Sequence, residues 1–173
     1  MSRAPISADE LQRLEQERFV ALFGGVFEHA PWVAERAFAA GPFHTVEALH
    51  GAMAGAMRRA PREEQLALIR AHPDLAGRAA VAGELSAASS AEQAGAGLDL
   101  CTPAEFESFR ELNDEYKEKF GFPFILAIKG RPRAEILAIF AQRLELAPEA
   151  EFEEALNQIA RIARFRLEDM IRS

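Results

Sequence analysis

Residues 102–121, with the sequence TPAEFESFRELNDEYKEKFG, carry the clearest helix signals in the chain. Thr102 is followed three residues later by Glu105, which is the spacing of a capping box at a helix N-terminus. Gly121 stands where a helix can end, because glycine readily adopts the left-handed conformation found after helix C-termini. This stretch therefore predicts one long helix that ends at Gly121.

Similar signals predict helices on both sides of this stretch. Ser7 to Glu10 reads as a capping box for a helix that stops near Gly24 and Gly25, and Ser89 to Glu92 reads as another. Thr45 can cap a helix with an apolar stripe, and proline suits the first turn. The other predicted helices are Pro31–Phe38, 45–57, Pro61–Ala71, a short helix from Leu75 to Val81 closed by Gly83, Pro132–Leu144, and Pro148 to the C-terminus.

Composition supports an all-α fold. The chain has 34 alanines but only 5 valines, 9 isoleucines and 2 threonines, and residues branched at Cβ are the ones that favour strands. Phe122 to Ile128 (FPFILAI) is too short and apolar to assign, so a strand and a buried helix both stay open. We predict a single domain over residues 1–173, an irregular bundle of about seven to nine helices.

Charge and cysteine content exclude several classes of protein. The net charge of −7 argues against a nucleic-acid binder, and no apolar run is long enough to span a membrane. Cys101 is the one cysteine, so neither a disulfide framework nor a cysteine-rich metal site is expected. The N-terminal residues lack the apolar region of a secretion signal, and the last residues are not a Ser-Lys-Leu peroxisomal address. A cytoplasmic protein is therefore expected.

His72 is the first candidate for chemistry. Pro73 disfavours helical conformation at the residue before it, so the preceding helix must end near His72. The partial negative charge of a helix C-terminus favours the protonated imidazole, which can act as a general acid. The alternative is a capping histidine that bonds the last carbonyls of the helix.

The residues from Ser89 to Gln93 are the second candidate. Glu92 occupies the position that a capping box requires, which by itself explains the residue. Alternatively, Glu92 reaches a pocket and hydrogen-bonds a polar substrate. Ser89 and Ser90, with the amides of Ala91 and Gln93, would then form a helix N-terminus that binds a carboxylate.

Arg166 is the third candidate. With Ile159 set at zero and 100° per residue, Arg166 falls at about 340°, on the same helix face as Ala163 at about 40°. An arginine on an apolar face needs an anionic partner. That partner is either an internal carboxylate or a bound anionic substrate. No two of the four histidines have metal-ligand spacing with a carboxylate, so no metal site is expected.

Four stretches together resemble a known family. They are GVFEHAPWVA at 25–34, AHPDLAG at 71–77, SSAEQAGAGLD at 89–99 and FGFPFI at 120–125. They resemble the 2-oxo-4-hydroxy-4-carboxy-5-ureidoimidazoline (OHCU) decarboxylases of urate degradation, over nearly the whole chain. The resemblance implies an all-α homodimer that converts OHCU to (S)-allantoin without a metal or an organic cofactor.

The resemblance also implies roles for individual residues. His72 matches the family's proton-donating histidine, and Arg166 matches a substrate-binding arginine. Glu92 lies in the matching serine-to-glutamine binding segment and is expected to be catalytic together with His72. The remaining implied substrate contacts are Pro73, Ser89, Ser90, Ala91, Gln93 and, through their backbone, Phe124, Ile125, Leu126, Ala127 and Ile128.

The expected chemistry suits such a site. Loss of carbon dioxide leaves electron density that the substrate itself can delocalise, so the protein must supply orientation and one proton. Sequence leaves the division of roles between His72 and Glu92 open. It also leaves two rival functions, a helical interaction module and an enzyme that acts on a related ureido compound.

Overall fold

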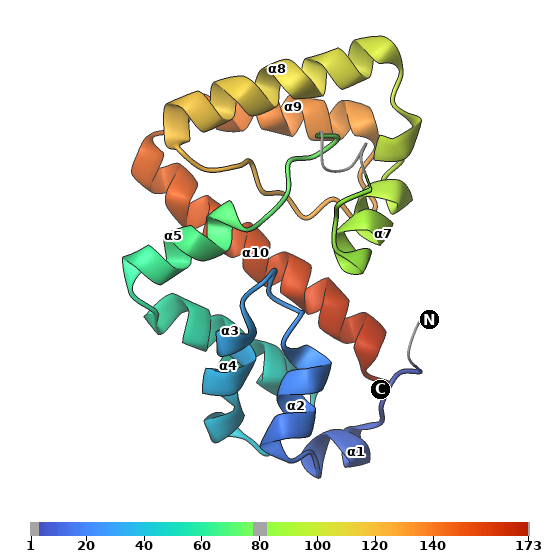
Figure 1. The fold of residues 1–173 in the computed structure, drawn as a ribbon, viewed down its shortest axis with the longest axis vertical. Coiled ribbons are helices and arrows are strands. Elements are labelled where there is room, and N and C mark those ends of the chain that lie inside the picture. Colours follow the sequence, from blue (N-terminus) through green and yellow to red (C-terminus); the bar gives the residue numbers. More distant parts are fainter. Residues whose placement is uncertain (1–3, 78–82, 173) are drawn as a thin grey trace. The chain divides into compact units, whose positions relative to one another are not determined.

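Helices form most of the computed structural model, which describes residues 4–77 and 83–172 (Figure 1). The chain divides into two units, described separately below. The terminal unit comprises Met1–Ala71 with Ile159–Ser173, and the central unit comprises His72–Gln158. The described residues contain nine α-helices and no β-strand, so the all-α prediction is confirmed.

The terminal unit begins with a helix that is shorter than predicted. The Ser7–Glu10 capping box is present, but the helix ends at Gln12 and Glu15 is extended before a second helix begins. The prediction of one helix up to Gly24 is therefore wrong. No glycine or proline marks the break; tertiary contact fixes the first helix instead, through a bridge between Ile6 and Ile171. The helices of this unit are α1 (Ala8–Gln12), α2 (Gln16–Phe23), α3 (Pro31–Ala37), the 3₁₀ helix η1 (Phe38–Ala40), α4 (Val46–Arg59) and α5 (Arg62–Arg70).

The core of the terminal unit is apolar and partly aromatic. Phe19 lies at 5.0 Å from Phe23 and 5.3 Å from Phe38 between ring centroids, in edge-on geometry. Leu49, Met53 and Met57 of α4 are fully buried, which confirms the apolar stripe predicted for that helix. Thr45 caps α4 as predicted, with its hydroxyl accepting from the N–H of Ala48 at 3.1 Å.

The central unit holds the long helix predicted from residues 102–121. Thr102 and Glu105 form the capping box, and Gly121 ends the helix at φ 76°. The helices of this unit are α7 (Ala87–Gly95), the 3₁₀ helix η2 (Leu98–Leu100), α8 (Pro103–Phe120), α9 (Arg133–Arg143) and the first half of α10 (Pro148–Met170). The short helix predicted from Leu75 to Val81 falls largely outside the described residues; Leu75 and Ala76 form a turn.

The segment Phe122 to Ile128 is neither a strand nor a helix, so both alternatives for it were wrong. The helices α8 and α9 lie side by side and run in the same direction, and the chain between them returns along their length (Figure 1). The connection must run back over at least the length of α9, whose 11 residues span about 16 Å. Extended chain covers ~3.3 Å per residue, so the seven residues 122–128 can cover that distance only in an extended conformation.

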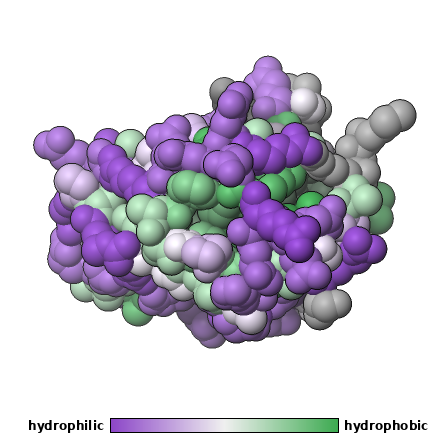
Figure 2. All heavy atoms as spheres, turned by 90° about the horizontal axis from the view of Figure 1, so that it is seen from below, coloured by the Kyte–Doolittle hydropathy of each residue, from purple (hydrophilic) through white to green (hydrophobic). Residues whose placement is uncertain are grey.

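Hydrophilic side chains cover much of the face shown in Figure 2. This agrees with 27% charged residues and a net charge of −7. In the described part of the chain, no helix is both long enough and apolar enough to cross a membrane.

Candidate functional site

His72 directly follows the end of α5, as the proline after it predicts. The helix ends at Arg70, and the N–H of Ala71 still bonds to the carbonyl of Ala67 at 3.0 Å. His72 is buried, with 8% of its surface exposed. An imidazole at this position is largely removed from bulk water while its backbone is fixed by Pro73.

The loop after His72 is held by two side chains from helices of the central unit. Gln93 of α7 accepts from the N–H of Ala76 at 3.0 Å and donates to the carbonyl of Asp74 at 3.1 Å. Asn113 of α8 donates to the carbonyl of Leu75 at 2.9 Å. Since Gln93 and Asn113 are both buried, these bonds satisfy backbone groups that water reaches poorly.

Two further features characterise the conformation of this loop. Lys117 of α8 donates to the carboxylate of Asp74 at 2.7 Å. Ala76 adopts φ 50°, a left-handed conformation that is strained for a residue with a Cβ. Such strain persists only where surrounding contacts impose it, and it concentrates at functional loops.

The helix α7 begins three residues earlier than predicted. Ser86 is its N-cap, with a side chain that accepts from the N–H of Ser89 at 3.2 Å. The capping box assigned to Ser89 and Glu92 is therefore wrong, and the amide of Gln93 lies inside the helix rather than at its N-terminus. Ser86 and Ser89 are both residues of a type that caps helices, and the sequence pattern favoured Ser89 because Glu92 follows it by three residues.

Within α7 the predicted residues lie on different faces. Ser89 and Gln93, one turn apart, are both 5% exposed, and Glu92 is half-buried. Ser90 and Ala91 are exposed. The buried face of α7 thus carries the side chain that holds the His72 loop.

A cavity of about 430 Å³ in the central unit is lined partly by α7. Its lining includes Ser90 and Gln93 from the predicted segment and Ala76 from the His72 loop. The other lining residues are Leu85, Ala94, Leu98, Asp99, Cys101 and Phe106. Among the described residues, 4–77 and 83–172, no three histidine, cysteine or acidic side chains form a cluster that could bind a metal ion.

The backbone of residues 124–128 is buried in the central unit and is held by side chains. Gln158 of α10 accepts from the N–H of Ala127 at 3.0 Å, and Arg131 donates to the carbonyl of Ala127 at 3.0 Å. The structure gives the N–H groups of Leu126 and Ile128 no hydrogen-bond partner within the described part of the chain. Buried backbone groups are normally paired, so these two donors are exceptions within the described residues.

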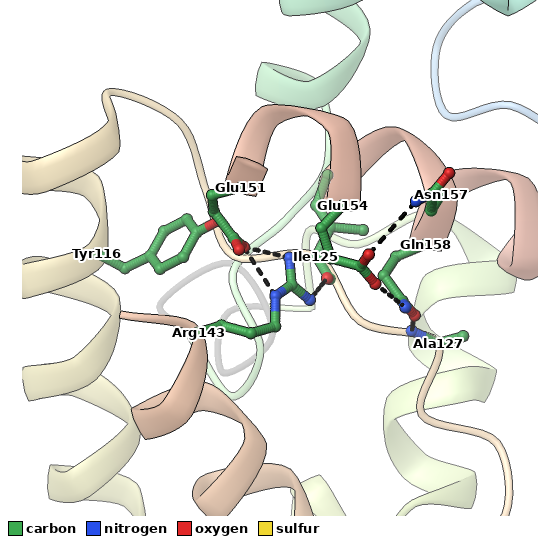
Figure 3. A network of polar contacts seen from close by, with 8 residues as sticks. All are labelled: Tyr116, Ile125, Ala127, Arg143, Glu151, Glu154, Asn157 and Gln158. Carbon is green, nitrogen blue, oxygen red and sulfur yellow. Dashed lines mark hydrogen bonds and ion pairs between the residues drawn. The ribbon is translucent and has the colours of Figure 1, made fainter. Parts of the chain in front are cut away.

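Arg143, at the end of α9, also contacts this segment (Figure 3). Its guanidinium donates to the carbonyl of Ile125 and lies over the ring of Phe124, 4.5 Å from the ring centroid. Glu151 of α10, which is completely buried, accepts two further bonds from Arg143 and one from the hydroxyl of Tyr116. Burial and the Glu151 carboxylate raise the pKa of Tyr116, so its hydroxyl keeps the proton that it donates.

Arg166 lies in the terminal unit and is buried, as its place on the apolar helix face predicts. Its guanidinium donates to Glu28 at 2.9 Å and to the carbonyl of Val26 at 3.1 Å. Glu28 is 3% exposed. The structure therefore contains the internal carboxylate that was one of the two alternatives for the partner of Arg166.

The structure places the other predicted site residues in the central unit, where the His72 loop and α7 are joined through Gln93. Sequence reasoning missed Glu28, Asn113, Arg143, Glu151 and Gln158. A signal existed for Asn113, which lies one turn from the buried residues Phe109 and Tyr116 on the inner face of α8. Glu28 is 138 residues from Arg166, and no local pattern connects the two.

Three comparisons relate this chain to known proteins. A family model described as OHCU decarboxylase matches residues 12–168. The chain is 42% identical over 168 residues to 2-oxo-4-hydroxy-4-carboxy-5-ureidoimidazoline decarboxylase of Haloferax volcanii, covering 97% of this chain and 98% of the relative. The corresponding protein of Halalkalicoccus jeotgali is 41% identical over 165 residues, covering 95% and 92%. A crystal structure of (S)-allantoin synthase is similar with a TM-score of 0.77 at 30% identity, covering 98% of this chain and 55% of that one.

Proposed function

Because the chain belongs to the OHCU decarboxylase family, we propose that it decarboxylates 2-oxo-4-hydroxy-4-carboxy-5-ureidoimidazoline to (S)-allantoin in urate degradation. The match of the family model over residues 12–168 carries this proposal. The enzyme is accordingly a carboxy-lyase, which breaks a carbon–carbon bond and releases carbon dioxide.

The reaction requires one proton for each carbon dioxide released. When the bond between C4 and its carboxylate breaks, its electron pair forms a C4=C5 double bond, and the electrons of the C5=N bond move to the ring nitrogen, which takes up a proton. The 4-hydroxyl then loses its proton and becomes the C4 carbonyl, while a proton binds to one face of C5, the carbon that carries the ureido group, and creates the new stereocentre. Since the substrate provides its own electron sink, the protein contributes orientation, charge stabilisation and that proton.

His72 is the proposed proton donor. A general acid has to be held within hydrogen-bond reach of the atom that it protonates, and its orientation decides which face receives the proton. The burial of His72 and the bonds that Gln93 and Asn113 make to the next residues support this role. Pro73 lines the same site in this proposal.

Glu92 and its neighbours on α7 are proposed to bind the polar groups of the substrate. A carboxylate at Glu92 can accept from the ureido N–H groups or keep His72 protonated. Ser89, Ser90 and Ala91 contribute polar and backbone contacts in this proposal. Gln93 already uses both side-chain polar atoms on the loop, so its contribution includes holding that loop in place.

The backbone of Phe124 to Ile128 is proposed to contact the ring and ureido groups. The N–H groups of Leu126 and Ile128, which bond to no group in the described residues, support this because a substrate carbonyl can accept from them. A rigid extended segment also loses little conformational entropy when a ligand binds.

Arg166 is proposed to anchor a carbonyl or carboxylate of the substrate while it remains bonded to Glu28. The bonds to Glu28 and to the carbonyl of Val26 hold the guanidinium in one orientation, and its positive charge suits a carbonyl or carboxylate of the substrate. The internal ion pair is the competing explanation of the residue, and a variant described below separates the two.

The direct test is incubation of the purified protein with freshly generated OHCU, followed by circular dichroism of the product. We expect rapid loss of OHCU and an optically active product with the sign of (S)-allantoin. An unchanged rate and a racemic product, equal to the sample without protein, would exclude this activity and favour the helical interaction module. Turnover of a related ureido compound but not of OHCU would indicate the other rival enzyme.

We further propose that the chain forms a homodimer and acts in the cytoplasm, as the resemblance implies. Sedimentation equilibrium is expected to give twice the chain mass of 19.1 kDa. Fractionated cells that express the protein are expected to retain it in the cytoplasmic fraction. A monomer mass at micromolar concentration, or recovery outside the cytoplasm, would contradict the respective proposal.

A further inference from the structure

The backbone of the extended segment Phe124–Ile128 is not paired in a helix or a sheet. It is buried, yet it forms neither a helix nor a strand, so other groups must satisfy its polar atoms. Arg143, Gln158 and Arg131 provide these bonds from three places in the central unit. The conformation of the segment therefore depends on side chains outside it.

Arg143 makes the contact that is hardest to replace. Its guanidinium lies over the Phe124 ring and donates to the carbonyl of Ile125, so it touches two consecutive residues of the segment. Phe124 is also stacked on Phe140 of α9, with 3.8 Å between ring centroids. The Phe124 ring thus lies between Phe140 and the guanidinium. These contacts restrict the backbone conformation at Phe124 and Ile125.

Glu151 holds the guanidinium in this orientation. Its Oε1 accepts from Nε of Arg143 at 2.8 Å, from Nη2, and from the hydroxyl of Tyr116 (Figure 3). With Nε and Nη2 occupied by one carboxylate oxygen, the planar guanidinium directs Nη1 at the carbonyl of Ile125. A buried ion pair is costly to build, and it adds little net stability compared with apolar residues.

We propose that Arg143 is a positioning residue for the decarboxylation, acting through the segment Phe124–Ile128 and oriented by Glu151 and Tyr116. The proposal rests on the proposed function, because it assumes that this backbone contacts the substrate. Arg143 does not touch the substrate itself. It fixes the carbonyl of Ile125, and thereby the direction of the unpaired N–H groups at Leu126 and Ile128 relative to the proton donor.

A positioning role predicts a loss of stereochemical control as well as rate. If the decarboxylated intermediate is held loosely, water as well as the acid can protonate C5, and from both faces. A shift of about 1 Å in a substrate-contacting group costs up to roughly 100-fold in rate. A purely structural ion pair would change the amount of folded protein but leave the enantiomeric ratio of the product unchanged.

The test compares two variants of the pair with a matched control. Arg143→Lys keeps the charge opposite Glu151 but loses the planar fork, and the double variant Arg143→Met/Glu151→Leu removes both charges together. For both we expect a roughly 10- to 100-fold lower kcat/KM per folded molecule, a raised KM, and a product of lower optical purity. Thermal unfolding is measured on each variant to count the folded fraction.

Arg133→Met is the control. Arg133 also bonds a glutamate, Glu105 at 2.8 Å, and a backbone carbonyl, Gly97 at 3.0 Å, in the same unit, but among the described residues it forms no hydrogen bond or ion pair with residues 124–128. We expect this variant to keep the kinetics and the optical purity of the wild type.

Three results would decide against the inference or its premise. Wild-type kcat/KM and optical purity in folded Arg143→Lys would overturn the positioning role, even if the double variant failed to fold. An equal loss of optical purity in Arg133→Met would also overturn it, because the effect would then not depend on residues 124–128. Absence of (S)-allantoin formation by the wild-type protein would refute the proposed function instead, so the two failures are distinguishable.

Discussion

At the scale of single residues, the ion pair between Arg166 and Glu28 leads to a prediction about stability. Arg166→Met keeps most of the side-chain volume but removes the 2.9 Å cationic partner of a carboxylate that is 3% exposed. We expect the free energy of unfolding to fall by about 3–5 kcal/mol in urea titrations. The double variant Arg166→Met/Glu28→Gln is expected to recover much of this loss, because neither residue of this pair then carries a buried charge.

The kinetics of the same variants test the substrate-binding role of Arg166. If the guanidinium anchors the substrate, kcat/KM per folded molecule falls in both the single and the double variant. A single variant as stable as the wild type would contradict the account of the ion pair. Full turnover per folded molecule in both would remove Arg166 from the substrate site.

Cys101 gives a prediction about chemical reactivity. Burial, followed by the negative charge of Glu105, raises the pKa of the Cys101 thiol above its usual value. A raised pKa leaves less thiolate at a given pH, and the thiolate is the reactive form. We expect Ellman's reagent at pH 8 to react more slowly with the folded protein than with the urea-unfolded protein. Equal rates in the two states would show that the thiol is not perturbed.

At the scale of elements, the bonds between α7 and the His72 loop are the feature to test. Gln93→Leu removes both side-chain bonds to the loop and leaves a buried N–H at Ala76 to be satisfied otherwise. We expect a loss of about 1–3 kcal/mol in unfolding free energy and a lower kcat/KM for each folded molecule. Denaturant unfolding and steady-state kinetics measure the two effects.

Gln65→Leu is a matched control for this variant. Gln65 is another buried glutamine that bonds two backbone carbonyls, those of Met57 and Arg58, both at 3.1 Å, but in the terminal unit. The Gln65→Leu variant should show a similar loss of unfolding free energy and keep the wild-type turnover per folded molecule. A Gln93→Leu variant with normal kinetics would show that the loop geometry does not depend on α7.

Three helix ends were predicted correctly from the sequence, because their signals are local. The Thr102 capping box, the Thr45 cap and the stop before Pro73 all act over three or four residues. The extended path of residues 122–128 depends on the parallel arrangement of α8 and α9, and on side chains 18 and 31 residues away. No periodicity within the segment records those contacts.

The candidate site likewise divides into residues predicted from local signals and residues that depend on distant contacts. His72 was identified from Pro73 beside it, and the inward direction of Arg166 from its helical angle. The start of α7 was misplaced, because Ser86 and Ser89 are alternative caps and only the packing of Ser89 and Gln93 decides between them. Gln158 and Glu28 were missed because their partners lie 31 and 138 residues away along the chain. Glu151 lies only eight residues from Arg143, but on the next helix, so no helical period relates the two.

At the scale of the whole molecule, the proposed chemistry predicts activity without metal. The electron pair released at C4 moves into the adjacent C5=N bond of the substrate, so no metal is needed as a Lewis acid. We expect full (S)-allantoin formation after exhaustive dialysis against EDTA and 1,10-phenanthroline. Activity that disappears on chelation and returns with one divalent metal would require a different mechanism.

The central claim is that His72 gives one proton to one face of the substrate. The most direct measurement is the optical purity of allantoin formed by His72→Asn, together with its kcat/KM and its thermal unfolding. We predict a folded variant whose rate falls roughly 10²- to 10⁴-fold and whose product is close to racemic. Formation of (S)-allantoin by folded His72→Asn at near the wild-type rate would contradict the claim.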